Sequence, residues 1–148
     1  MTNMKKILFL LVLVLAVGVL TSCDIDSTRN GNLDGFWVMQ RIDTLATGGS
    51  ADVHARQPKL TYSVSAHLLQ LRGADREILC RFSLTADSLI LSDPYYGGWC
   101  QPDNEVKDVE MLQPYGINRI EEHFHIEALD SKKMILASKE LRLYFRKY

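Results

Sequence analysis

The sequence lacks the compositions that are typical of disordered, fibrous and nucleic-acid-binding proteins. Its 148 residues include only four prolines and nine glycines without any repeat, which excludes a disordered low-complexity chain and a fibrous protein. Basic residues are not in excess, with 17 Lys and Arg against 18 Asp and Glu. A chain without surplus positive charge is poorly suited to neutralise a phosphate backbone, so no nucleic-acid partner is expected.

Motifs for catalysis and for nucleotide or cofactor binding are also absent. The sequence contains no Gly-x-Ser-x-Gly, P-loop, His-Glu-x-x-His or Cys-x-x-Cys pattern. We therefore predict neither an enzyme nor a cofactor. The best metal candidates are His123 and His125, which share one face if they lie on a strand and could bind zinc with a third ligand. The interpretation that we favour for these two is a solvent-facing polar stripe without metal.

An apolar segment is present at the N-terminus. Lys5 and Lys6 precede an unbroken apolar run of 14 residues at 7–20. This run is too short to cross about 30 Å of hydrocarbon comfortably, and it is typical of a secretory signal peptide. Removing residues 1–22 would leave 126 residues, enough for one domain, with 15 basic and 18 acidic residues and a net charge of −3.

The end of this segment, Leu20-Thr21-Ser22-Cys23, resembles the lipobox of bacterial lipoproteins. The resemblance implies that Cys23 receives a diacylglycerol and becomes the first residue after cleavage, so that acyl chains such as palmitate hold the protein on a membrane. The alternatives are an ordinary signal peptide or a short uncleaved anchor. Residues 23–32 are polar and predict a tether, whose Asp24 and Asp26 resemble an acidic surface-export signal of some Gram-negative lipoproteins. The expected location is the outer membrane, periplasmic or surface-exposed.

Two cysteines remain once Cys23 is assigned to the lipid. In an oxidising compartment, Cys80 and Cys100 could form a disulfide that closes a loop of about 20 residues and contributes roughly 3 kcal/mol. In the alternative, Cys80 is a small buried residue in a strand and Cys100 is a free thiol in a loop.

Residues 33–148 are predicted to form one all-β domain, because alternation of period two recurs and no long amphipathic helix competes with it. Residues 46–57 read as a loop, 93–108 as an irregular segment, and 105–113 as one or two helical turns stopped by Pro114. Antiparallel strands in a domain of this size must form a sandwich or a barrel. About eight short strands are expected, at 36–43, 60–65, 68–72, 77–84, 89–91, 124–128, 134–137 and 141–148.

Gly35-Phe36-Trp37 at the start of the first strand resembles the Gly-x-Trp motif of lipocalins and the wider calycin group. The resemblance implies an up-and-down eight-stranded barrel in which Trp37 fills the closed end. It also implies that an arginine of the last strand stacks on this ring, and of Arg142 and Arg146 we prefer Arg146. The whole chain resembles the lipocalin-like domains of small lipoproteins from Gram-negative anaerobes, which share a lipobox, a tether, Gly-x-Trp and a terminal Phe-Arg-Lys-aromatic strand.

The segment after Pro94 carries Tyr95, Tyr96 and Trp99, which could contact a ligand or a partner. In the alternative, these rings form a small satellite core.

The sequence predicts two alternative functions. The first is a membrane-anchored lipoprotein that binds a small apolar or amphipathic ligand inside its barrel. The second is an interaction lipoprotein with a solid barrel core, which docks to an envelope protein, peptide or glycan through this aromatic loop.

Overall fold

The domain consists of antiparallel strands and three short 3-10 helices. The computed structural model describes residues 30–98 and 104–148, and no helix in these two ranges is long and apolar enough to cross a membrane. The elements in chain order are η1 (Gly31–Leu33), β1 (Gly35–Thr44), β2 (Gly49–Asp52), β3 (Thr61–Ser65), β4 (Leu68–Arg72), β5 (Ile78–Leu84), β6 (Ser88–Tyr96), η2 (Val109–Met111), η3 (Gln113–Tyr115), β7 (Glu122–Leu129), β8 (Lys133–Ala137) and β9 (Leu141–Lys147).

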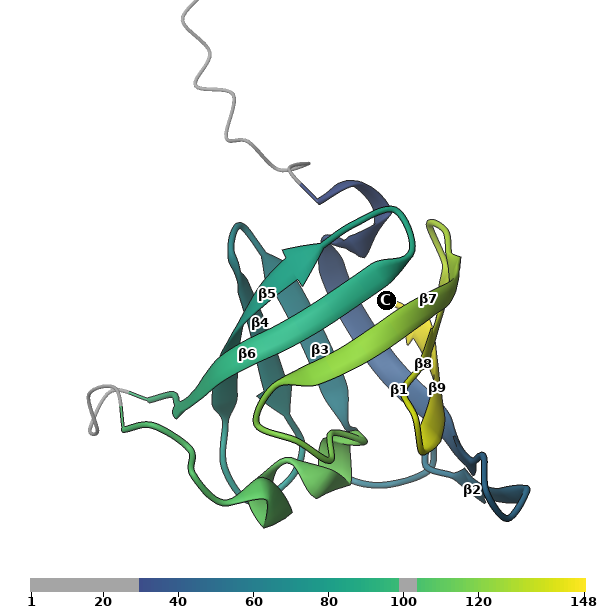
Figure 1. The fold of residues 1–148 in the computed structure, drawn as a ribbon, viewed down its shortest axis with the longest axis horizontal. Helices are drawn as coiled ribbons and strands as arrows, with labels where there is room; N and C mark the ends of the chain where they lie inside the picture. Colours follow the sequence, from purple (N-terminus) through teal and green to yellow (C-terminus); the bar gives the residue numbers. More distant parts are fainter. Residues whose placement is uncertain (1–29, 99–103) are drawn as a thin grey trace, which may run out of the picture.

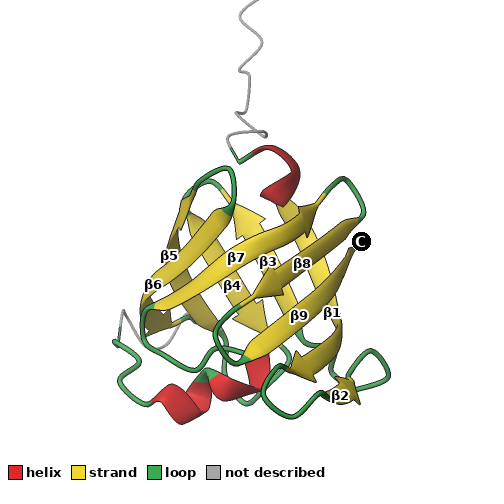
Figure 2. Ribbon diagram, turned by 45° about the vertical axis from the view of Figure 1, so that its right-hand side comes forward, coloured by secondary structure: helices red, strands yellow, loops and turns green. Residues whose placement is uncertain are grey.

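Pairing between β1 and β9 closes the sheet into a barrel (Figure 1 and Figure 2). The strand order is β2-β1-β3-β4-β5-β6-β7-β8-β9, and β1 also pairs with β9. The long strand β1 pairs with β9 along one edge, whereas its other edge pairs first with β3 and then with β2. Eight strands thus form the closed barrel, and the short β2 extends it as a hairpin. The antiparallel eight-stranded barrel predicted from the sequence is confirmed.

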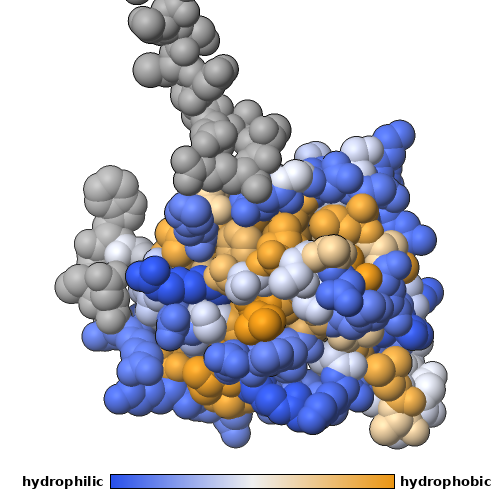
Figure 3. All heavy atoms as spheres, turned by 45° about the horizontal axis from the view of Figure 1, so that its top comes forward, coloured by the Kyte–Doolittle hydropathy of each residue, from blue (hydrophilic) through white to orange (hydrophobic). Residues whose placement is uncertain are grey.

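The barrel has two distinct ends. The N-terminal end carries η1 and the turns at 66–67, 85–87 and 130–132. The opposite end carries the turns at 73–77 and 138–140, together with the long connection from β6 to β7. Figure 3 is turned so that the N-terminal end comes forward, and hydrophobic surface (orange) is visible there between hydrophilic side chains (blue).

Most strand boundaries lie within two residues of the prediction, and two differences are larger. The expected loop at 46–57 contains β2, because Gly48 adopts a φ of +69° and its N–H donates to the carbonyl of Thr44 at 2.9 Å, which turns the chain back on β1. The expected irregular segment at 93–108 begins inside β6, which continues to Tyr96.

The connection from β6 to β7 covers the opposite end of the barrel. The predicted helical turns form in part, as η2, but Pro114 does not stop them, because it lies inside η3, where its fixed φ suits the start of a helical turn. Leu112, Tyr115 and Ile117 of this segment are buried in the core. The Tyr62 hydroxyl donates to the carbonyl of Tyr115 at 2.7 Å, from inside the barrel. Gly116 has a φ of +76°, and a Cβ there would lie 2.5 Å from Leu143 Cδ2, so this close approach requires glycine.

Side chains from all eight barrel strands fill the interior. The Tyr62 and Phe145 rings lie 4.7 Å apart between their centroids. Cys80 is 2% exposed and packs among these apolar side chains. The other buried members of the core on the barrel strands are Trp37, Met39, Val64, Leu69, Leu71, Ile78, Leu89, Leu91, Phe124, Met134, Leu136 and Leu143.

Trp37 is fully buried toward the N-terminal end, below η1. Its indole N–H donates to the carbonyl of Leu33 at 2.8 Å, and the Lys147 ammonium lies 4.9 Å from its ring centroid. The prediction that Arg146 stacks on this ring is wrong. The register pairs Trp37 with Lys147 and Val38 with Arg146, so Arg146 points outward and is exposed.

Gly35 makes room for this lysine. It has a φ of +124°, and a Cβ there would lie 2.6 Å from Lys147 Cε. The Lys147 side chain therefore crosses the backbone of Gly35, and its ammonium also donates to the carbonyl of Asn32 at 2.9 Å. The spacing of Gly35 and Trp37 thus has a structural reason, because the glycine admits the cation that covers the ring.

Replacing Trp37 with alanine is expected to lower the free energy of unfolding by about 3–5 kcal/mol, since a large cavity would remain in a packed core. The neighbouring Phe36 is 41% exposed, and Phe36→Ala is the matched control, expected to cost under about 1 kcal/mol. Urea denaturation of both variants measures the difference. Equal shifts of the two midpoints would contradict this role for Trp37.

Candidate functional site

The predicted aromatic loop is partly strand. Trp99 and Cys100 lie outside the described residues, whereas Tyr95 and Tyr96 end β6. The Tyr96 N–H donates to the carbonyl of Asn104 at 2.9 Å, and the Val106 N–H donates to the carbonyl of Pro94 at 2.8 Å. The chain returning after residue 103 therefore pairs with the end of β6 and holds both tyrosines in place.

The two tyrosines have different surroundings. Tyr96 packs against the core, and the Arg76 guanidinium carbon lies 4.2 Å from its ring centroid. Tyr95 is opposite Leu79 of β5 and forms a bridge with Glu105. Tyr96 is thus mainly structural, whereas the half-buried Tyr95 is available to a ligand.

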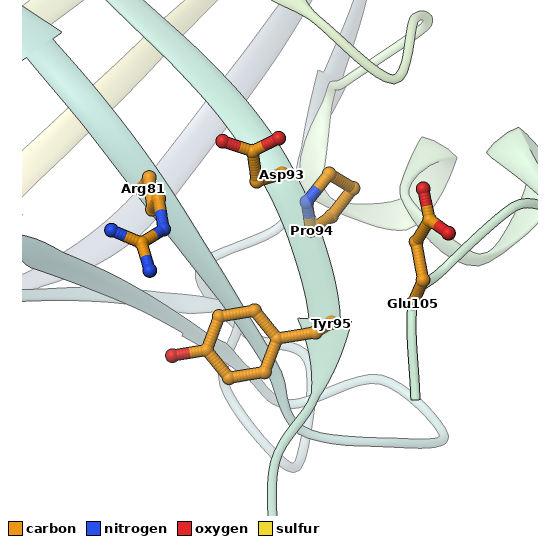
Figure 4. A pocket seen from close by; sticks show the side chains of 5 residues that line it. All are labelled: Arg81, Asp93, Pro94, Tyr95 and Glu105. Carbon is orange, nitrogen blue, oxygen red and sulfur yellow. The ribbon is translucent and has the colours of Figure 1, made fainter. Parts of the chain in front are cut away.

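Tyr95 lines a surface pocket of about 340 Å³ on the outer wall of the barrel (Figure 4). Arg81 enters from β5, Asp93 and Tyr95 from β6, and Glu105 from the segment after β6. In Figure 4, Arg81 and Tyr95 extend to the same side of β6, while Glu105 lies on its other side. Pro94, which is buried, completes the lining.

A β-bulge in β6 lies at this pocket. Tyr95 pairs with Leu79 and Ser92 pairs with Arg81, so β6 has one residue more than β5 between these pairs. Asp93 takes up the extra residue with a φ of +47°, a left-handed conformation that costs energy for a residue other than glycine. Retained strain of this kind is common at functional sites.

The pocket offers one cation, two carboxylates and a ring. Among the described residues, the Arg81 side chain forms no hydrogen bond or ion pair, and the residue is exposed. Asp93 accepts only a 3.4 Å bond from the Ser92 hydroxyl, and Glu105 is 3.9 Å from Lys107. Such a set can bind a polar group that carries a charge and can stack on the Tyr95 face.

The other predicted site residues do not join this pocket. His123 and His125 are exposed on β7, where His123 Nε2 lies 2.8 Å from Glu121. Across residues 30–98 and 104–148, no group of three His, Cys, Asp or Glu side chains could hold a metal ion, so this pair lacks a third ligand there. Cys23 lies outside the described residues.

Cys80 has a free thiol inside the core, as the second interpretation predicts for this residue. Burial raises the pKa of this thiol to about 12, so the thiolate does not form near neutral pH. Its predicted disulfide partner, Cys100, is in the part of the chain that the structure leaves undescribed.

A group of polar residues that the sequence did not predict as a site lies at the start of β7. Glu122 is 2% exposed and accepts the Asn118 N–H at 2.8 Å. The Arg119 guanidinium lies 3.4 Å from Glu122 and 2.6 Å from Glu140, and its hydrogen bonds lower the pKa of the Glu140 carboxyl.

The pocket residues Arg81, Asp93 and Glu105 were likewise not predicted from the sequence. A charged residue at each of these positions was the only available signal, and surface charges are common.

Comparisons with known proteins agree with the barrel. A family model described as a lipocalin-like domain matches residues 18–148. A lipocalin-like protein from Bacteroides uniformis has a similar structure, with a TM-score of 0.61 and 19% identity over 80% of this chain and 100% of that one. An uncharacterized protein from Bacteroides eggerthii has a TM-score of 0.55 and 19% identity, over 78% of this chain and 98% of that one.

A protein from Burkholderia xenovorans, solved by NMR, has a TM-score of 0.55 and 13% identity, with 78% of this chain and 82% of that chain covered. At such identities these structures indicate a shared fold alone. Among curated proteins, none matches this sequence. The family model, however, spans most of the chain, and the chain therefore belongs to the lipocalin-like domain family.

Proposed function

We propose that this protein is an envelope lipoprotein, anchored through Cys23, that binds its partner on the outer wall of the barrel rather than inside it. The packing of the interior is the observation that carries this proposal. Core side chains from the barrel strands are fully or almost fully buried, and Leu33 at one end and Tyr115 at the other are 0% exposed. A filled barrel favours the second of the two predicted functions over the first.

The pockets of the described residues support an external site. Five of them have volumes of about 340–560 Å³, and none of these five is lined by a side chain of the interior cluster. Val38, which lines one of them, is buried on the outer face of β1 opposite Arg146. The pocket around Tyr95 combines an unpaired cation with an aromatic face. A peptide segment of an envelope protein that carries a carboxylate matches this combination, because Arg81 can pair with the carboxylate while Tyr95 contacts an apolar part.

A specific observation also favours a second candidate function, the binding of a small apolar molecule. Phe82, Leu84, Ile126 and Leu129 belong to the inner faces of their strands but are only half-buried, near the N-terminal end. A short apolar ligand could enter there and displace part of the core. The two candidates differ in whether the barrel takes up such a molecule.

The anchor is tested with Cys23→Ser, which removes the thiol that would accept the lipid. The variant is expected to leave the membrane fraction after carbonate washing, whereas the unmodified chain stays. Immunoblots of the two fractions measure this, with Cys100→Ser as the control cysteine variant. A Cys23→Ser chain that remains in the membrane would contradict the proposed anchor.

The filled interior is tested with 11-(dansylamino)undecanoic acid as an apolar probe, titrated into a chain that begins at Asp24. We expect no saturable rise in fluorescence, because the core side chains leave no room for the acyl chain. A saturable rise that disappears in Leu84→Arg and Ile126→Arg variants would favour the second candidate function instead.

The external site is tested by photo-crosslinking in the cells that make the protein. With p-benzoyl-phenylalanine in place of Tyr95, illumination should yield an adduct of defined mass that Arg81→Glu abolishes. The same photoreactive residue in place of Ile90, on the same strand but farther from the pocket, is the control and should yield none. Equal adducts from both positions, or none from position 95, would refute the pocket as the binding site.

A further inference from the structure

Two exposed aromatic side chains lie side by side where the first and last barrel strands meet. Tyr148 is 86% exposed and Phe36 is 41% exposed, and they are two of the four large apolar side chains exposed among the described residues. The Tyr148 N–H donates to the carbonyl of Phe36 at 2.9 Å. The rings are thus held next to each other on the outer wall, although neither contributes to the core.

Three cations adjoin these rings. Lys133 and Arg146 are direct partners across β8 and β9, and Lys132 precedes Lys133 in the turn. Within the described chain, no ion pair is formed by any of the three. The carboxylate of that turn, Asp130, accepts the backbone N–H groups of Lys132 and Lys133 at 2.7 and 2.8 Å.

This arrangement does not serve the stability of the fold. Like charges directly opposite each other in a sheet are destabilising, and Lys133 faces Arg146 in this way. We call this region, where Phe36, Tyr148 and the three cations lie, the corner. It contains three cations and one carboxylate, so it has a local excess of positive charge although the chain as a whole is acidic. Such an excess favours a negatively charged partner outside the protein.

The place of the corner on the barrel indicates which partner this is. The Lys147 ammonium, between Arg146 and Tyr148, donates to the carbonyl of Asn32 at 2.9 Å, so the last strand contacts the start of the described chain. Seven residue steps separate Cys23 from Asn30, which span about 25 Å at most. A chain anchored at Cys23 therefore keeps this corner close to the bilayer.

We propose that Phe36, Lys132, Lys133, Arg146 and Tyr148 form a docking patch for an anionic lipid bilayer. The two rings lie at the level of the headgroups and the three cations contact lipid phosphates, as aromatic and basic side chains do at membrane surfaces. The orientation that follows rests on the proposed anchor at Cys23. The contact with the bilayer is independent of that anchor, because it requires only the five side chains.

Docking in this way gives the barrel a fixed orientation. The N-terminal end faces the bilayer, as the turn at 130–132 and η1 lie there. Tyr95 and Glu105 lie toward the opposite end, where β6 leads into the connection to β7. The pocket proposed as the binding site is thereby turned away from the membrane and toward a partner in solution.

The test uses the chain that begins at Asp24, which contains every described element and lacks Cys23. This chain keeps all eight barrel strands and every residue of the core, so the whole barrel is present in it. The probes are sedimented vesicles of phosphatidylcholine alone and of phosphatidylcholine with about one third phosphatidylglycerol. We expect binding to the anionic vesicles only, and its loss in about 1 M NaCl, where charges are screened beyond about 3 Å.

Charge reversal locates the contact. Lys132→Glu, Lys133→Glu and Arg146→Glu together should weaken binding to the anionic vesicles by about tenfold or more. The matched control is Arg56→Glu, Lys107→Glu and Lys139→Glu, which changes the net charge equally on exposed residues away from the patch and should weaken binding by about threefold or less. Thermal melts check folding, and the corresponding glutamine variants should change binding in the same direction but less.

Several results would overturn the proposal. Among them are no binding to anionic vesicles, equal binding to neutral ones, and equal weakening by the two triple variants. A Phe36→Ser, Tyr148→Ser double variant that binds like the unmodified chain would also refute the part assigned to the rings. Because the test omits Cys23, its outcome is independent of the fractionation experiment on the anchor.

Discussion

The pairing of β1 with β9 is the constraint on which the rest of the structure depends. Seven residue pairs, from Trp37–Lys147 to Thr44–Leu141, join the first and last barrel strands. This pairing leaves no free edge among the eight barrel strands and forces every inward side chain into one enclosed space. It also brings Gly35, Trp37 and Lys147 together, so that the closure of the barrel and the cover of its N-terminal end are one arrangement.

The enclosed space is filled by the chain itself. The segment from Leu112 to Ile117 enters the opposite end, where Gly116 permits contact with Leu143 and Tyr115 accepts the Tyr62 hydroxyl. A barrel packed in this way gains stability from burial of apolar surface, but it gives up the cavity that a ligand would need. Recognition is therefore best supported by features of the outer wall, where a pocket lies at the bulge of Asp93.

The two proposed surfaces lie toward different ends of the barrel and differ in character. The docking patch combines exposed rings with cations and lies next to Lys147, which contacts Asn32 near the start of the described chain. The pocket around Tyr95 combines one cation with two carboxylates and an aromatic ring. Taken together, the two proposals have the barrel present one end to lipid and the other to a partner protein.

The sequence by itself determined much of the fold. Alternation identified Ile78, Cys80, Phe82 and Leu84 as one face of a strand, and these residues do face inward, because the period of a strand is set by local geometry. The spacing of Gly35 and Trp37 pointed to the closed end of a barrel. The resemblance carried by these two residues was confirmed by the family to which the chain belongs.

Only the tertiary structure decided which side chains meet. Whether Arg146 or Lys147 covers Trp37 depends on the register between two strands that are about a hundred residues apart, and no local pattern specifies it. The extra residue at Asp93 is likewise visible only against the pairing with β5, and Arg81 and Glu105 line one pocket only because β5 and residue 105 both pair with the end of β6. Periodicity in the sequence sets the face of each residue, whereas contacts across the closed barrel set its neighbours.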